Sequence, residues 1–158
     1  MKYCKRCLQP DTRPNSVFVA SGICPACDYF ERLQHVDWRE RFEILEDLLS
    51  AHKRSGNQQF DCIIGVSGGK DSTRQALWVR DKLGLRPLLA CLSYPPEQVT
   101  QRGVDNISNL IELGFDVVIS APAPGVWKAL MKESFMRFSN WARSTELALF
   151  SSVPQLAI

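Results

Sequence analysis

The residues from Cys62 to Ser72 constrain the fold more than any other part of the chain. Cys62 to Val66 is a short run rich in β-branched residues, the pattern of a buried strand. It leads directly into Ser67-Gly-Gly-Lys-Asp-Ser72, where a helix is expected to begin. Glycines let a backbone curl around an anion without Cβ clashes, and the start of a helix adds positive potential. The segment therefore predicts a strand, an anion-binding loop and a helix in direct succession.

This loop (residues 67–72, the glycine loop) differs from the two commonest phosphate-binding motifs. A Walker A loop requires G-x-x-x-x-G-K-[ST], but Ile64 stands at the first glycine position and Asp71 follows the lysine. No G-x-G-x-x-G motif is present either. A carboxylate beside a phosphate cradle would repel the phosphate unless it acts through Mg²⁺. We therefore expect Asp71 to act with Mg²⁺ and Lys70 to add positive charge. The alternative is an ordinary Gly-Gly turn, which the full hexapeptide in this setting disfavours.

Alternating elements follow the glycine loop. We expect a helix from Ser72 to Leu83 that ends before Gly84, and then a strand from Leu88 to Leu92. The next helix carries Val104, Ile107 and Ile111 and ends at Gly114, before a third strand from Phe115 to Ile119. From about Val126 the pattern is helical with one break. This order predicts an α/β fold with a doubly wound parallel sheet. Such sheets generally have more strands, so we expect this domain to be incomplete at its C-terminus.

Two C-x-x-C pairs lie near the N-terminus. Cys4 and Cys7 are separated by sixteen residues from Cys24 and Cys27, a spacing typical of zinc sites. Zinc favours four soft ligands in a tetrahedron, and four thiolates leave no open position for catalysis. We therefore expect a structural Zn²⁺ in a small zinc ribbon, with Val17–Ala20 as a short strand before a turn at Ser21-Gly22. The alternative is two redox or disulfide pairs. Cys62 and Cys91 fall inside expected strands, where core packing is their expected role.

A helix is expected between the zinc module and the glycine loop. Its apolar positions share one helical face, and Asp37 with Glu40 three residues later resembles a capping box. The helix should end by Ser55-Gly56-Asn57. We thus divide the chain into a zinc module at 1–34, a helix and linker at 35–58, and an α/β domain that carries the glycine loop at 59–158. The apolar positions of this helix are Trp38, Phe42, Leu45, Leu49 and His52.

Charge and hydropathy exclude some functional classes. The net charge is only +2 and no basic stripe is present, which disfavours nucleic acid as a partner. No apolar run is long enough to span a bilayer, and the N-terminus lacks the apolar stretch of a secretory signal. We therefore expect a cytoplasmic protein that does not bind membranes, in a compartment where thiols stay reduced.

The glycine loop resembles the S-G-G-x-D-S loop of the PP-loop ATP pyrophosphatases. In that superfamily the loop holds the pyrophosphate end of ATP with Mg²⁺, and ATP is cleaved between its α and β phosphates. The resemblance implies an adenine nucleotide alpha hydrolase-like fold, with Lys70 and Asp71 as catalytic residues. By the same resemblance, the strand ends around Val66 and Leu92-Ser93 flank the adenosine. The loop residues implied to contact ATP are Ser67, Gly68, Gly69, Asp71 and Ser72.

A closer resemblance covers most of the chain. Five segments are similar to the N-acetyl sugar amidotransferases of bacterial lipopolysaccharide, O-antigen and flagellin-glycan pathways. They are Tyr3–Cys7, Pro10–Pro14, Gly22–Cys27, Asp37-Trp38 and the glycine loop, and the segment Asn140–Glu146 is also similar.

This second resemblance implies an activity and partners. ATP adenylates the acetamido group of a nucleotide-activated sugar, and ammonia then displaces AMP to leave an acetamidino group. The ammonia comes from a separate glutaminase resembling that of imidazole glycerol phosphate synthase, with a cyclase-like partner. Those enzymes continue well beyond residue 158. The substrate contacts expected are Asn140, Arg143, Thr145 and Glu146, for which an exposed helix face is the alternative.

Two other functions stay open. Some PP-loop enzymes that thiolate or otherwise modify tRNA also begin with cysteine-rich zinc modules. They typically use cysteines after the loop, where this chain has only Cys91. The second is a non-enzymatic scaffold, a zinc module on a degenerate nucleotide-binding domain, against which the intact glycine loop argues. Asp11 and Arg13 are expected to brace the zinc module.

Overall fold

The computed structural model describes residues 1–12, 14, 16–53 and 59–157. The chain divides into two compact units, Met1–Gly56 and Asn57–Ile158. Each unit is described by itself.

The first unit contains the four cysteines and two helices, α1 (Pro25–Leu33) and α2 (Trp38–Lys53). The short strand expected at Val17–Ala20 does not form, and the isolated bridge among the described residues of this unit joins Tyr3 to Pro10. The turn at Ser21-Gly22 is present, because Gly22 N–H donates to the Val19 carbonyl over 2.8 Å. Helix α1 was not expected. It forms because proline suits the first helical position and the Cys24 side chain caps the first turn.

Helix α2 begins as the sequence predicts. The Asp37 carboxylate accepts hydrogen bonds from Arg39 N–H (2.9 Å) and Glu40 N–H (3.0 Å), so Asp37 is the N-cap. The apolar face of α2 is only partly buried: Trp38 is 63% exposed, whereas Leu45 and Leu49 are partly buried. The side chain of His52 and the expected linker Ser55-Gly56-Asn57 lie outside the described residues.

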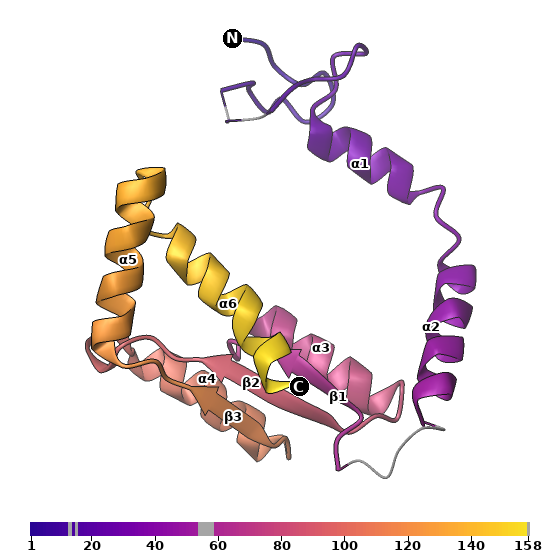
Figure 1. Ribbon diagram of the computed structural model, residues 1–158. Helices are drawn as coiled ribbons and strands as arrows, with labels where there is room; N and C mark the ends of the chain where they lie inside the picture. The colour runs from indigo at the N-terminus through magenta and orange to yellow at the C-terminus, as the bar shows by residue number, and fades with distance from the viewer. Residues whose placement is uncertain (13, 15, 54–58, 158) are drawn as a thin grey trace. The chain divides into compact units, whose positions relative to one another are not determined.

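The second unit is a mixed α/β structure around a small parallel sheet (Figure 1). The strands pair in the order β1-β2-β3, with Ile64 opposite Leu89 and Leu89 opposite Val117. The sheet therefore follows chain order throughout the described residues, and the reversal that defines a doubly wound sheet stays a prediction. The elements are β1 (Cys62–Gly65), α3 (Lys70–Asp81), β2 (Pro87–Leu92), the 3₁₀ helix η1 (Pro96–Gln98), α4 (Gln101–Glu112), β3 (Val117–Ser120), α5 (Pro124–Phe138) and α6 (Arg143–Leu156).

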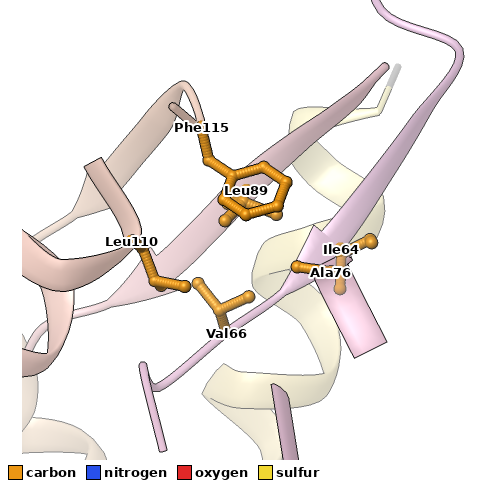
Figure 2. Close-up of a cluster of buried hydrophobic side chains, with 6 residues drawn as sticks. All are labelled: Ile64, Val66, Ala76, Leu89, Leu110 and Phe115. Carbon is orange, nitrogen blue, oxygen red and sulfur yellow. The ribbon is translucent and has the colours of Figure 1, made fainter. Parts of the chain in front are cut away.

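One face of the sheet forms the core of this unit (Figure 2). Leu89 of β2 and Leu110 of α4 have no exposed surface, and Ala76 of α3 is also fully buried. Figure 2 shows these side chains gathered with Ile64, Val66 and Phe115. Strand residues two positions apart share a face, so the core fixes which way β1 presents its side chains. The expected strand from Phe115 begins instead at Val117, since Phe115 turns into the core.

Helix α6 lies against the other face of the sheet (Figure 1). Gly65 alternates with the core residues Ile64 and Val66, and a Cβ added to it would lie 3.0 Å from Val153 Cγ2 of α6. The break expected after Val126 is present between α5 and α6, where Ser139 adopts a left-handed conformation (φ 51°). The sheet is thus covered by α3 and α4 on one face and by α6 on the other.

The helix boundaries follow the glycine signals. Gly84 and Gly114 have φ of +62° and +84°, just past α3 and α4 as predicted. On α4, Val104 and Ile111 are 47% and 57% exposed, while Ile107 packs against the core. Helical periodicity identified this helix but not which of its apolar residues are buried. None of the helices in the described part of the chain is long and apolar enough to cross a bilayer.

Candidate functional site

The four N-terminal cysteines come together in one cluster. Their Sγ atoms all lie within 4.8 Å of one another. Cys4 and Cys7 flank a turn in which Leu8 N–H donates to the Cys4 carbonyl over 3.0 Å. Cys24 is the N-cap of α1 and Cys27 lies in its first turn. The pairs predicted from the spacing therefore meet, one from a turn and one from the start of a helix.

Backbone amides point at the sulfur atoms. Cys4 Sγ accepts from Arg6 N–H (3.4 Å) and from Cys24 N–H (3.3 Å), and Cys24 Sγ accepts from Cys27 N–H (3.5 Å). Backbone hydrogen bonding, first from Cys7, lowers the pKa of the buried Cys4 thiol to about 6 despite its desolvation. Burial raises the pKa of Cys27 to about 12, and hydrogen bonds from the neighbouring cysteines add to the rise. The cluster thus favours a thiolate at Cys4. It disfavours deprotonation of Cys27 unless a cation balances the added negative charge.

This geometry fits a tetrahedral metal ion. Zn–S bonds of about 2.3 Å place the sulfurs of a Cys₄ site roughly 3.8 Å apart. Cys7 Sγ and Cys24 Sγ are separated by 3.7 Å. None of the six cysteines forms a disulfide. The four cysteines could therefore bind a metal ion such as zinc.

Residues outside the cluster brace it. Lys2 N–H donates to the Asp11 carboxylate, and Asp11 N–H donates back to the Lys2 carbonyl, both over 3.0 Å. The Arg6 guanidinium pairs with Glu31 of α1 and lies 5.6 Å from the centre of the Phe30 ring. The Arg6 contacts tie the Cys4–Cys7 turn to α1. Among the described residues Asp11 links only to Lys2, so its bracing role stays a prediction, and Arg13 lies outside the described part of the chain.

The glycine loop lies at the carboxyl end of β1, directly before α3. The helix begins at Lys70, two residues earlier than predicted, so Gly69 is its N-cap. Glycine offers no side chain, and no side-chain hydrogen bond caps this helix. Inside the loop, Gly69 N–H approaches Ser67 Oγ at 3.4 Å and Ser72 Oγ donates to the Gly69 carbonyl over 3.2 Å. The first turn of α3 therefore retains amides without a capping side chain, the arrangement that binds anions at helix N-termini.

Gly68 is held in place by residues that sequence reasoning missed. Its φ is +70°, and an added Cβ would lie 2.6 Å from the backbone oxygen of Asn106 in α4. Thr73 Oγ1 donates to the Gly68 carbonyl over 3.3 Å. No sequence pattern marks Asn106, because it is 38 positions away from Gly68 and reaches the loop only through the packing of α4. Any residue other than glycine at position 68 would require the loop to move.

The two predicted catalytic side chains point into solvent. Lys70 Nζ and Asp71 Oδ1 form an ion pair of 2.7 Å, with the side chains 89% and 88% exposed. They largely neutralise each other beside the loop. The attraction of the loop for an anion therefore rests on backbone amides and neutral side chains in this arrangement.

The carboxyl ends of β2 and β3 form a shallow depression at the same edge of the sheet. Its volume is about 490 Å³. Ser93 N–H bonds to the Ser120 carbonyl over 2.8 Å, which joins the two strand ends. The Tyr94 ring stacks on the buried Trp127 with centroids 5.6 Å apart. Ser93, which is predicted with Leu92 to flank adenosine, therefore lines this depression together with Tyr94. The depression is lined by Ser93, Tyr94, Pro96, Val99, Ala121, Pro122, Ala123 and Pro124.

The predicted substrate residues lie at the turn between α5 and α6. Asn140 Oδ1 accepts from Ala142 N–H (2.9 Å), and the Asn140 carbonyl accepts from the buried Ser134 Oγ (2.6 Å). Arg143 pairs with Glu146 over 3.1 Å on an exposed face, and Thr145 is partly buried.

These residues are separated from the glycine loop along α6. Val153, which approaches Gly65 of β1, follows Arg143 by ten residues. At 1.5 Å per residue this is a separation of roughly 15 Å along the helix. Among the described residues, no hydrogen bond or ion pair joins 140–146 to the loop.

No family model matches the chain, and the comparison with curated proteins found no match.

Proposed function

We propose that this protein is an ATP-dependent amidotransferase of the PP-loop type that acts on an acetamido sugar. The observation that supports this most is the glycine loop, which follows a parallel strand of the sheet and opens a helix that no side chain caps. Ligands of open α/β sheets bind outside the carboxyl ends of the strands, which is where this loop lies. The S-G-G-K-D-S sequence adds the resemblance to enzymes that cleave ATP to AMP and pyrophosphate.

In this proposal each part of the loop has a role. The amides at the start of α3, with Ser67 and Ser72, bind the pyrophosphate end of ATP. Gly68 and Gly69 let the phosphates approach the backbone. Asp71 is the carboxylate that would hold Mg²⁺, which usually binds through one or two carboxylates and the phosphates of its nucleotide. Asp71 would then leave its ion pair with Lys70, freeing the lysine to stabilise negative charge on the phosphates.

Adenylation makes the acetamido group reactive enough for ammonia to attack it. An amide is a poor electrophile, and transfer of AMP to its oxygen creates a good leaving group. Ammonia then attacks the carbon, AMP departs with the oxygen, and an acetamidino group remains. The depression at Ser93 and Tyr94 lies at the same strand edge and offers room for adenosine. Residues 140–146 are retained as proposed substrate contacts, reached through movement of the α5–α6 turn or of the sugar.

The remaining assignments follow from the same proposal. The four-cysteine cluster holds a structural zinc ion. Ammonia is supplied by a separate glutaminase with a cyclase-like partner, as the resemblance to the N-acetyl sugar amidotransferases implies. The product serves lipopolysaccharide, O-antigen or flagellin-glycan synthesis in the cytoplasm.

Acceptor competition tests the substrate assignment. The protein is incubated with MgATP, ammonium and either a UDP-linked acetamido sugar or tRNA, and pyrophosphate release is followed. We expect the sugar with ammonium to stimulate release and tRNA to have no effect. Stimulation by tRNA alone would assign the protein to tRNA modification instead. ATP binding without turnover on any acceptor would support the scaffold.

A further inference from the structure

The contact between Gly68 and Asn106 extends the nucleotide site to helix α4. A Cβ placed on Gly68 would lie 2.6 Å from the Asn106 oxygen, 2.7 Å from its carbonyl carbon and 2.7 Å from its Cβ. The last of these distances matters most, because it shows that the Asn106 side chain leaves the helix next to the loop. Helix α4 therefore lies beside the loop. Its residue Asn106 is not part of the S-G-G-K-D-S motif.

The Asn106 side chain is unused in the fold. It is partly buried, and no hydrogen bond to its carboxamide is found among the described residues. A carboxamide carries two N–H donors. In the described part of the chain, the polar atoms of Asn106 are not among the buried side-chain atoms that lack a partner, so they are accessible to solvent and available to donate to a ligand. The side chains of Thr100 and Gln101, earlier on the same helix region, are by contrast engaged, with Gly103 N–H and Asp105 respectively.

The charges near the loop make a neutral donor useful. Lys70 is paired with Asp71, so the loop itself presents little net positive charge. Once Mg²⁺ has neutralised part of a polyphosphate, the remaining oxygens are suited to uncharged N–H donors. Thr73 is already bound to the Gly68 carbonyl and is not available for this.

We infer that Asn106 is a binding residue for the phosphate groups held by the glycine loop, donating a carboxamide hydrogen bond to a phosphoryl oxygen. This inference rests on the proposed function, because it takes the loop to be a polyphosphate site. It adds a residue of α4 that the S-G-G-K-D-S motif does not include. It also gives Gly68 a second purpose, since only glycine lets α4 approach closely enough for Asn106 to reach the ligand.

Binding of inorganic pyrophosphate with Mg²⁺, of MgATP and of adenosine, measured by isothermal titration calorimetry, tests this inference. The variants are Asn106→Ala and the nearly isosteric Asn106→Asp, and the matched control is Asn109→Asp. Asn109 lies on the same helix, is exposed, and receives the same change of charge. All titrations are made well below the thermal midpoint of each variant.

We expect Asn106→Ala to weaken pyrophosphate and MgATP roughly two- to tenfold, the range of one neutral hydrogen bond. Asn106→Asp should weaken both at least tenfold, because a carboxylate would face the phosphates. Adenosine binding should be unchanged, and Asn109→Asp should behave as the native protein.

Two results would overturn the inference. Affinities for pyrophosphate within twofold of native in both Asn106 variants would exclude a contact. An equal loss for adenosine and pyrophosphate would indicate a general structural effect. If the native protein bound neither pyrophosphate nor MgATP, the proposed function itself would fail and the inference with it, an outcome distinct from the first two.

Discussion

At the scale of single residues, Gly68 is the position where backbone conformation and packing act together. Its positive φ alone disfavours a side chain by about 1–2 kcal/mol. A side chain at position 68 would also collide with the Asn106 backbone. Backbone atoms within a helix cannot move aside as the end of a flexible side chain could. Gly84 has a similar φ of +62° but open space around it. A comparison of substitutions at the two glycines therefore separates the cost of the positive φ from the cost of the close contact.

Gly68→Ala should destabilise the protein more than Gly84→Ala does. Both variants lose the positive-φ term, and only the first must displace α4 or the loop, which adds roughly 1–3 kcal/mol. Urea unfolding followed by circular dichroism measures the difference. Equal losses in the two variants would mean that α4 yields freely at Asn106.

The partly buried thiols of Cys62 and Cys91 give stability a pH dependence. Burial raises the pKa of both, with Asp61 adding to the rise at Cys62. The folded state thus holds these protons more tightly than the unfolded chain, whose cysteines titrate near about 8.5. Their contribution is complete below that pH and is lost as pH rises through the folded pKa.

We therefore expect the free energy of unfolding to fall above pH ~8.5, and to fall less in Cys62→Ala/Cys91→Ala. The comparison is made at pH 7, 8, 9 and 10 under reducing conditions, where other alkaline titrations cancel between the two proteins. Parallel curves for the native protein and the variant would contradict this account.

At the scale of elements, the parallel sheet determines which apolar side chains matter. Helix α4 presents Leu110 to the core with no exposed surface, while its neighbour Ile111 is 57% exposed. Adjacent residues on a helix point in directions about 100° apart, so Leu110 and Ile111 lie on different faces of α4. This helix was predicted from Val104, Ile107 and Ile111, yet the side chain that is wholly buried is Leu110.

Leu110→Ala should cost about 2–5 kcal/mol of stability, and Ile111→Ala well under 1. Chemical denaturation of both variants provides the test, each acting as the control for the other. A loss at Ile111 comparable to that at Leu110 would show that the exposed face of α4 is covered in solution.

Local signals were sufficient to predict most elements of the second unit. Gly84, Gly114 and the β-branched strand positions act within a few residues of themselves, and the elements they predict are present. Helix α1 was missed because its first turn depends on the Cys24 cap rather than on apolar periodicity. Asn106 was missed for another reason: its contact with Gly68 exists only after α4 has packed on the sheet. Local chemistry therefore predicted the loop and the cysteine cluster, and tertiary packing supplied the rest.

At the scale of the whole molecule, the two units have different sources of stability. The second has a hydrophobic core built around Leu89. In the first, the apolar residues that are fully buried within the described part are Cys4 and Cys24. Binding of a metal ion by the four cysteines would supply folding free energy to such a unit, as it does in small metal domains.

We expect one zinc ion per chain after purification without chelator. Cys24→Ser should lose the metal and the helical signal of α1, whereas Cys91→Ala should retain the full stoichiometry. Atomic emission spectroscopy with thiol titration checks both. Absence of metal, with the four clustered thiols freely titratable in the native protein, would refute the zinc site.

The central claim is that the glycine loop directs cleavage of ATP between its α and β phosphates. The most direct measurement is the identity of the products when the protein turns over MgATP with an acetamido sugar nucleotide and ammonium, read by ³¹P NMR. We expect AMP and pyrophosphate in equal amounts, and we expect Ser67→Ala/Asp71→Ala to abolish their formation. Formation of ADP and inorganic phosphate would contradict this claim.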